Sequence, residues 1–332
     1  MDVKKYILVI LLVLIAALFP PILNLPGSLQ YLLDLSLIYA IVAIGLNLLM
    51  GYAGQISLGH GAFLAVGAYT SAYLTLNLHL PFFIALILSG LVTGIVGIFL
   101  GIPALRLEGN YLAIATLGFG IAVTQIFAIW TSFTGGFSGI RPPKPEIFGF
   151  KFSSYLSYYY VILVVLIIVI ILTQNIVRTK IGRSLMAMRD SEIAAKAMGI
   201  NVSYYKTLAF GLSAFYTGIA GSLYAHLLGF MTPYDYAFSI GMSLNFLAMI
   251  VIGGMGTISG SIIGAIIMTW LPQLTSNLSS IKSLSQIITG AIIIAVVMFY
   301  PNGIAYAGAR LKDKLERLFT KHQEKIVVKI EK

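Results

Sequence analysis

The residues best placed for chemistry in this sequence are glycines and polar side chains embedded in two apolar stretches. The motif G-x-x-G-x-I-S occurs at residues 51–57 and again at 253–259, each time between two apolar half-segments. Glycines at membrane depth permit either a broken helix or a very close approach of two helices. Interrupted apolar segments in both halves of a chain point to a transport pathway. The chemistry predicted here is non-covalent passage of a solute, with plain helix packing as the alternative.

The candidate pathway residues are the glycines of both motifs and the polar side chains near them. They are Asn47, Gly51, Gly54, Gln55, Ser57, His60, Asn245, Gly253, Gly254 and Gly256. A lone histidine or amide in an apolar span is also a common packed residue, so both interpretations stay open for each polar member. Nothing resembles a catalytic triad or a metal-ligand cluster, and the chain has 0 cysteines. We therefore expect neither an enzyme nor a metal site.

The elements that must position these residues are membrane spans. Residues of the AVILMFWYC set make up 59% of the chain, charged residues make up 10%, and the mean hydropathy is +0.96. Soluble domains carry about 25% charged residues, so this composition indicates an all-α polytopic membrane protein. We predict about ten transmembrane helices (about 8–10) from apolar stretches of spanning length. The stretches are 6–23, 29–50, 62–78, 82–103, 111–133, 155–176, 207–229, 238–252, 261–272 and 284–300.

The distribution of basic residues predicts the orientation. With both termini in the cytoplasm, seventeen of the 21 Lys and Arg residues fall on the inside and four on the outside. This bias follows the positive-inside rule. The expected organisation is a permease domain over residues 1–308, with an extracytoplasmic loop at 134–154, and a charged cytoplasmic tail at 309–332. The net charge of +10 lies in loops and tail, which argues against nucleic-acid binding.

The long polar segment 178–206 is a candidate docking surface. It carries six Lys or Arg residues against two acids. Asp190 or Ser191 can cap a helix start, and Gly199 can end the helix. A short basic helix between spans is suited to a cytoplasmic partner, although a basic loop without a partner is the simpler alternative.

Two absences bear on the energy source. No acid, lysine or arginine lies at the centre of a predicted span, whereas ion-coupled carriers usually need ionisable groups there. Sodium coupling through backbone carbonyls remains open. The chain also has no GxxxxGK[ST] phosphate-binding loop. We therefore expect a separate subunit to bind and hydrolyse ATP, and no cofactor on this chain.

Five ordered segments resemble the branched-chain amino-acid ABC transporter permeases. They are residues 45–63, 106–119, 134–140, 181–200 and 253–260. The RLEGNYLAIATL and TGG sequences are more similar to the LivM-type subunit than to its LivH-type partner. The resemblance implies a cell-membrane importer with a LivH-type second permease, two cytoplasmic ATPase subunits and an extracytoplasmic binding protein.

The resemblance also implies that residues 190–199 form the ATPase-docking helix. The docking candidates are Arg189, Asp190, Glu192, Ala194, Ala195 and Gly199. The family's EAA---G pattern is altered here, because Ile193 stands at the acidic position and Glu192 is displaced by one. Ile121 and Asn245 also stand where many members carry an acid.

The resemblance implies leucine, isoleucine and valine as substrates, moved by alternating access. Similar permeases carry urea, short amides or other amino acids, so these remain alternative substrates. An ion-coupled carrier acting alone is the alternative of a different class.

Overall fold

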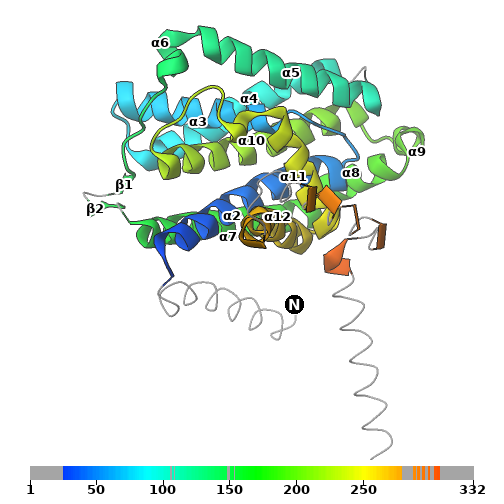
Figure 1. The fold of residues 1–332 in the computed structure, drawn as a ribbon. Coiled ribbons are helices and arrows are strands. Elements are labelled where there is room, and N and C mark those ends of the chain that lie inside the picture. The colour runs from blue at the N-terminus through cyan, green and yellow to red at the C-terminus, as the bar shows by residue number, and fades with distance from the viewer. Residues whose placement is uncertain are drawn as a thin grey trace, which may run out of the picture.

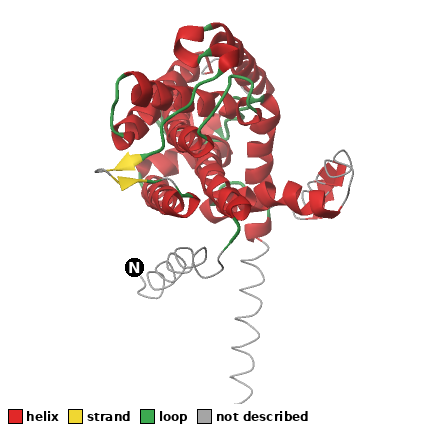
Figure 2. Ribbon diagram, turned by 60° about the vertical axis from the view of Figure 1, so that its left-hand side comes forward, coloured by secondary structure: helices red, strands yellow, loops and turns green. Residues whose placement is uncertain are grey.

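The computed structural model describes residues 25–104, 107, 109–147, 150–152 and 154–278, and beyond these 287, 288, 290, 291, 294, 295, 298, 299 and 303–306. The described chain is a helical bundle with a small hairpin at one end (Figures 1 and 2). Two of the predicted spans fall largely outside this part: 6–23 lies entirely outside it, and 284–300 is described only in fragments. The tail 309–332 also lies outside the described residues.

The helices and strands follow the chain in a simple order. The α-helices are α2 (Gly27–Asn47), α3 (His60–Asn77), α4 (Phe82–Ala104), α5 (Asn110–Ile129), α6 (Thr131–Thr134), α7 (Tyr155–Arg178), α8 (Lys180–Asp190), α9 (Glu192–Ala197), α10 (Val202–Leu228), α11 (Ile240–Gly253) and α12 (Ile258–Leu278). A π-helix covers Leu48–Tyr52, and 3-10 turns cover Gly136–Ser138 and Tyr236–Phe238. Strands β1 (Glu146–Ile147) and β2 (Phe150–Lys151) pair antiparallel.

Each of the eight predicted segments between residues 29 and 272 coincides with a helix. Six of the described helices are long and apolar enough to cross a membrane, and α11 is a shorter apolar helix. The predicted span 111–133 is wrong at its end, because the helix stops at Ile129 and a separate turn, α6, follows Trp130. The all-α class is confirmed, and the predicted loop 134–154 contains one short hairpin of two-residue strands, β1 and β2. The structure therefore confirms a largely helical, multi-span protein.

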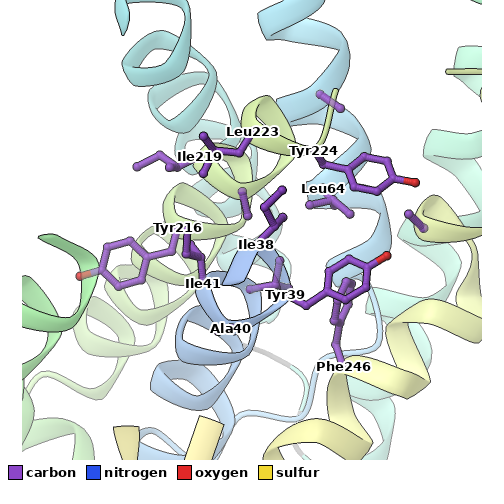
Figure 3. Packing of buried hydrophobic residues seen from close by; sticks show 14 of the residues in the cluster. Ile38, Tyr39, Ala40, Ile41, Leu64, Tyr216, Ile219, Leu223, Tyr224 and Phe246 are labelled. Carbon is purple, nitrogen blue, oxygen red and sulfur yellow. The ribbon is translucent and has the colours of Figure 1, made fainter. Parts of the chain in front are cut away.

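Helices α2 and α10 form the centre of the bundle. Helix α10 packs along α3, α4 and α2, while α2 also contacts α12 and α7. Figure 3 shows the aliphatic and aromatic side chains where α2, α3, α10 and α11 meet, with Ile38, Ile41 and Leu223 all 0% exposed. The rings of Tyr39 and Phe246 meet edge to face at 5.3 Å in the same core. This packing fixes the positions of α2 and α10, on which residues of the candidate site lie.

The bundle has two distinct ends (Figure 1). Helices α8 and α9 lie at one end, called here the α8 end, and strands β1 and β2 lie at the opposite, hairpin end. Helix α2 runs from the hairpin end to the α8 end, and α12 lies antiparallel beside it, since Trp270 Nε1 donates to Ser36 Oγ and Asn47 Nδ2 donates to Ser261 Oγ.

Candidate functional site

The first glycine motif is a true helix break. Helix α2 widens into the π-helix Leu48–Tyr52, the chain is unwound from residue 54 to 59, and α3 begins at His60. Side chains of neighbouring helices bond the backbone of this region: Leu58 N in the unwound segment donates to Thr116 Oγ1 at 2.9 Å, and Gly61 N in the first turn of α3 donates to Ser243 Oγ at 2.9 Å. Non-helical backbone at membrane depth is tolerated where it is buried in protein or lines a water-filled cavity.

The second motif is also a break, with close helix packing beside it. Helix α11 ends at Gly253, and Gly254 and Gly256 take φ values of 120° and 77°, which favour glycine. A side chain on Gly253 would overlap the backbone of Gly260, because α11 and α12 approach each other backbone to backbone there. Both interpretations of the glycines, a break and close packing, therefore describe real features of this segment.

The structure brings the two breaks together through Asn47. Its Oδ1 accepts from Gly256 N at 2.8 Å, and its Nδ2 donates to Thr257 O at 2.8 Å and to Ser261 Oγ at 2.9 Å. Because the second break offers a donor to Oδ1 and an acceptor to Nδ2, these partners decide which side-chain atom of Asn47 is the oxygen and which is the nitrogen. A side chain on Gly51 would overlap both Asn47 and Gly256. Two motifs about two hundred residues apart thus form one buried cluster.

His60 ties the first break to the central helix α10. The ring is fully buried, with Nδ1 3.2 Å from Ser57 Oγ and Nε2 2.7 Å from Ser213 Oγ. Gln55 is also buried, but its Oε1 has no hydrogen-bond partner among the described residues. His60 is thus held on both sides, whereas Gln55 keeps an unused acceptor beside the break.

Asn245 lies apart from this cluster. It is near the start of α11, and its Nδ2 donates to Tyr236 OH at 2.8 Å. The other candidate pathway residues lie in one of the two breaks or directly beside one.

Within the segment 178–206, helices α8 and α9 are joined at Ser191, and α10 begins at Val202. The Ser191 hydroxyl accepts from Ala194 N at 3.3 Å and so caps α9, and Gly199 follows α9 with φ at 77°. The expected cap and stop residues are confirmed. The folded unit is shorter than predicted, because Asp190 ends α8 and α9 covers only Glu192–Ala197.

Arg189 connects α8 to the first break. Its Nη1 donates to Gly51 O at 2.9 Å, and its Nε and Nη2 donate to Asp190 Oδ1 at 3.0 and 2.9 Å. Its aliphatic carbons lie against Gly54, which has φ at 70°. Arg189 therefore belongs to the glycine cluster as well as to the docking segment.

The docking candidates on α9 face two ways. Ala194 and Gly199 are exposed, and beside them Ile193 and Met198 are 83% and 82% exposed. Ala195 is buried in a core cluster that includes Leu185, Met188 and Val202. Glu192 turns inward, with its Oε1 2.5 Å from Lys206 Nζ on α10.

Several residues of this region were missed by the sequence interpretation. Lys206 is 2% exposed although it lies at the end of a basic loop, and Ser213 and Thr116 are partners of the first break. Asp34, inside α2, is fully buried and neither carboxylate oxygen has a partner among the described residues. Its position in an apolar stretch was the available signal, but burial depends on the packing of α2.

The hairpin end carries a pocket of about 370 Å³. It is lined by the turn before α4, by residues 143–146 and by His226, whose Nδ1 lies 2.7 Å from Pro143 O. In the described part of the chain, no group of three or more His, Cys, Asp or Glu residues is arranged to hold a metal ion.

Comparisons with known proteins agree with this architecture. The family model described as "Branched-chain amino acid transport system / permease component" matches residues 28–297. The chain is 34% identical to the permease protein LivM of the high-affinity branched-chain amino acid transport system of Escherichia coli K12, over 91% of this chain and 75% of LivM. It is 32% identical to LivM of Salmonella typhimurium over the same shares.

A more distant similarity is to the ribose import permease protein RbsC of Haemophilus influenzae, at 25% identity over 89% of this chain and 91% of RbsC. No solved structure matches the chain. The family match covers most of the chain, and six of the described helices are long and apolar enough to cross a membrane. The chain is a multi-pass membrane protein that belongs to the branched-chain amino acid transport system permease family.

Proposed function

We propose that this permease is the LivM-type subunit of an ATP-binding-cassette importer that moves leucine, isoleucine and valine by alternating access. The observation that carries the proposal is the 34% identity to E. coli LivM over 91% of this chain. The proposed partners are a LivH-type second permease, two cytoplasmic ATPase subunits and an extracytoplasmic binding protein. This chain would bind no ATP itself.

The proposed orientation places the α8 end in the cytoplasm. The basic segment 178–206 lies at that end, as the positive-inside rule favours. Helix α2 then begins on the outer side, so the stretch 6–23 would return the N-terminus to the cytoplasm. Together with 284–300, this gives ten spans, a permease domain over 1–308 and a cytoplasmic tail at 309–332.

The proposed ATPase contact is the exposed face of α9. Ile193 and Met198 are large apolar side chains that are 83% and 82% exposed on a helix that is otherwise anchored to the bundle. We take these two exposed side chains as the apolar part of the surface that the ATPase subunit contacts. Arg189, Asp190, Ala194 and Gly199 border this face, whereas Glu192 and Ala195 support it from inside.

The transport proposal is tested by reconstitution. The chain is purified with a second permease, ATPase subunits and a binding protein, and sealed into vesicles. Uptake of labelled leucine, isoleucine and valine is measured with and without ATP. We expect uptake of all three that requires ATP and every subunit.

Competing substrates and a carrier mechanism are distinguished in the same vesicles. Alanine, urea, acetamide and ribose are offered separately, ribose because of the similarity to RbsC. Preferred uptake of any of these would overturn the substrate assignment. Uptake by this chain alone, driven by a sodium or proton gradient, would overturn the ATP-driven importer.

A further inference from the structure

The α8 end of the bundle holds an unusual chain of contacts between segments distant in sequence. Arg189 on α8 contacts the carbonyl of Gly51 in the first break, and Asn47, one turn earlier on α2, contacts the second break. We propose that Arg189 and Asn47 are positioning residues that form a latch, through which movement of α8 is passed to both glycine breaks. This inference rests on the proposed function.

In the Asn47 half of the latch, a side chain of α2 acts as a cap for the neighbouring helix α12. The groups it bonds, Gly256 N and Thr257 O, lie at the turn between α11 and α12. Thr257 O also accepts from Ser261 N, the first backbone bond of α12, so the Asn47 amide bonds directly beside the start of that helix. Asn47 is 1% exposed, so water cannot replace it. Both of its amide hydrogens and its oxygen are engaged, so α2 cannot shift relative to α12 without breaking these bonds.

The Arg189 half of the latch caps the end of α2. The π-helix ends at Tyr52, and among the described contacts the Gly51 carbonyl accepts from Arg189 Nη1 rather than from the next helical turn. A guanidinium at the C-terminal end of a helix is also favoured by the helix dipole. Asp190 holds the same guanidinium from its other edge, which fixes its direction.

The glycines explain why the latch can close. Gly51 lies between the two halves, and any side chain there would overlap Asn47 and the second break. Gly54 gives room for the stem of Arg189. The two breaks are therefore in backbone contact at the α8 end. A displacement of α8 would pull on the carbonyl of Gly51, one turn from the Asn47 bonds that hold the first break to the second.

The latch predicts loss of coupling rather than loss of assembly. In the reconstituted importer, Arg189→Ala is compared with Arg183→Ala, at another exposed arginine of α8 whose Nη1 donates to Arg178 O. A charge-assisted hydrogen bond changes an equilibrium by a factor of about ten or more. We expect Arg189→Ala to lower the amount of leucine taken up per ATP hydrolysed by about tenfold, and Arg183→Ala to leave it unchanged.

The Asn47 half has its own matched control. Asn47→Leu keeps the branched shape of the side chain and removes the bonds to the second break, and Ser36→Ala removes the α2–α12 bond near the middle of α2. Should Asn47→Leu fail to fold, Asn47→Asp keeps the shape and the acceptor but cannot donate to Thr257 or Ser261. We expect either Asn47 variant to match the loss seen in Arg189→Ala. The double variant should be no worse than the more severe single one, because both act through one latch.

The outcomes separate the latch from the proposed function. Normal leucine uptake per ATP in Arg189→Ala or in the Asn47 variants, beside a working wild-type complex, would overturn the latch. An equal loss in Arg183→Ala or Ser36→Ala would also overturn it, because general packing would then explain the result. A wild-type complex that moves no branched-chain amino acid would instead overturn the proposed function.

Discussion

The ammonium of Lys206 lies 2.5 Å from the Oε1 of Glu192, and this ion pair joins the short helix α9 to the central helix α10. The Lys206 side chain is 3% exposed and that of Glu192 is 26% exposed. Glu192 is the acid that stands one position away from the family's docking glutamate. In this structure the Glu192 carboxylate anchors α9 to α10 rather than facing outward.

The unequal burial of the two partners predicts unequal costs. Removing one partner of a buried ion pair costs about 3–5 kcal/mol, because the remaining charge is left uncompensated. Glu192→Gln leaves the buried ammonium and should approach this cost, whereas Lys206→Met leaves a carboxylate that water can reach and should cost less. Thermal unfolding of the purified protein in detergent measures the difference. Lys196→Met, which changes an exposed cation of α9, serves as the control; a more severe effect of Lys206→Met than of Glu192→Gln would contradict the assignment.

The two faces of α9 should respond differently to charge. Ile193→Glu and Met198→Glu change exposed side chains, so the protein should fold normally but lose its ATPase subunits on purification. Burying one such side chain contributes about 1.5–3 kcal/mol, so each variant should weaken the association by about tenfold or more. Ala195→Asp places a carboxylate in the core cluster and should lower the melting temperature itself. Normal ATPase co-purification with both exposed-face variants would argue against docking at α9.

The orientation can be tested with single cysteines, because the natural chain has 0. Met198→Cys marks the α8 end and Phe137→Cys, 78% exposed, marks the hairpin end. In spheroplasts that express the chain without ATPase subunits, a membrane-impermeant maleimide should label Phe137→Cys at once. It should label Met198→Cys only after permeabilisation. The reverse pattern would invert the proposed topology.

Local signals in the sequence were sufficient for most of the fold. Apolar stretches of spanning length predicted the long helices α2, α3, α4, α5, α7, α10, α11 and α12, because such segments must satisfy their own backbone in lipid. Ser191 and Gly199 marked α9 through capping chemistry that depends on near neighbours alone. The end of α5 was missed, since the apolar pattern continues through Trp130 although the helix does not.

The contacts of the candidate site could not be predicted from local sequence signals. Asn47 bonds residues 210 and 214 positions away, and no periodicity specifies such a pairing. The repeated glycine motif predicted both breaks but not that the two breaks contact each other. Likewise, the sequence placed Lys206 in a polar loop, and only the packing of α9 beside the start of α10 brings it to Glu192 and buries it.

Close helix packing in the centre of the bundle depends on glycine at specific positions. A side chain on Gly67 would overlap the backbone of Gly218, so α3 and α10 would have to separate. Overpacking of this kind costs about 1–3 kcal/mol, and Gly67→Ala should lower the melting temperature accordingly. Gly118→Ala is the matched control, because nothing lies within 4 Å of the added atom and alanine is the better helix former. Equal melting temperatures for the two variants would show that α3 and α10 are not in such close contact.

His60 is the candidate pathway residue whose role the geometry constrains most. Its two ring nitrogens lie near the hydroxyls of Ser57 and Ser213, and the ring is 0% exposed, so a passing solute would have to displace a contact on one side. We therefore expect a structural role at the junction of the first break with α10. His60→Ala should cost about 1–3 kcal/mol, because it leaves buried hydroxyls without their partner. The leucine concentration at half-maximal uptake should stay unchanged in the folded fraction. His79→Asn, at an exposed turn with φ at 49°, controls for loss of a histidine. A shifted half-maximal concentration at unchanged stability would instead place His60 on the pathway.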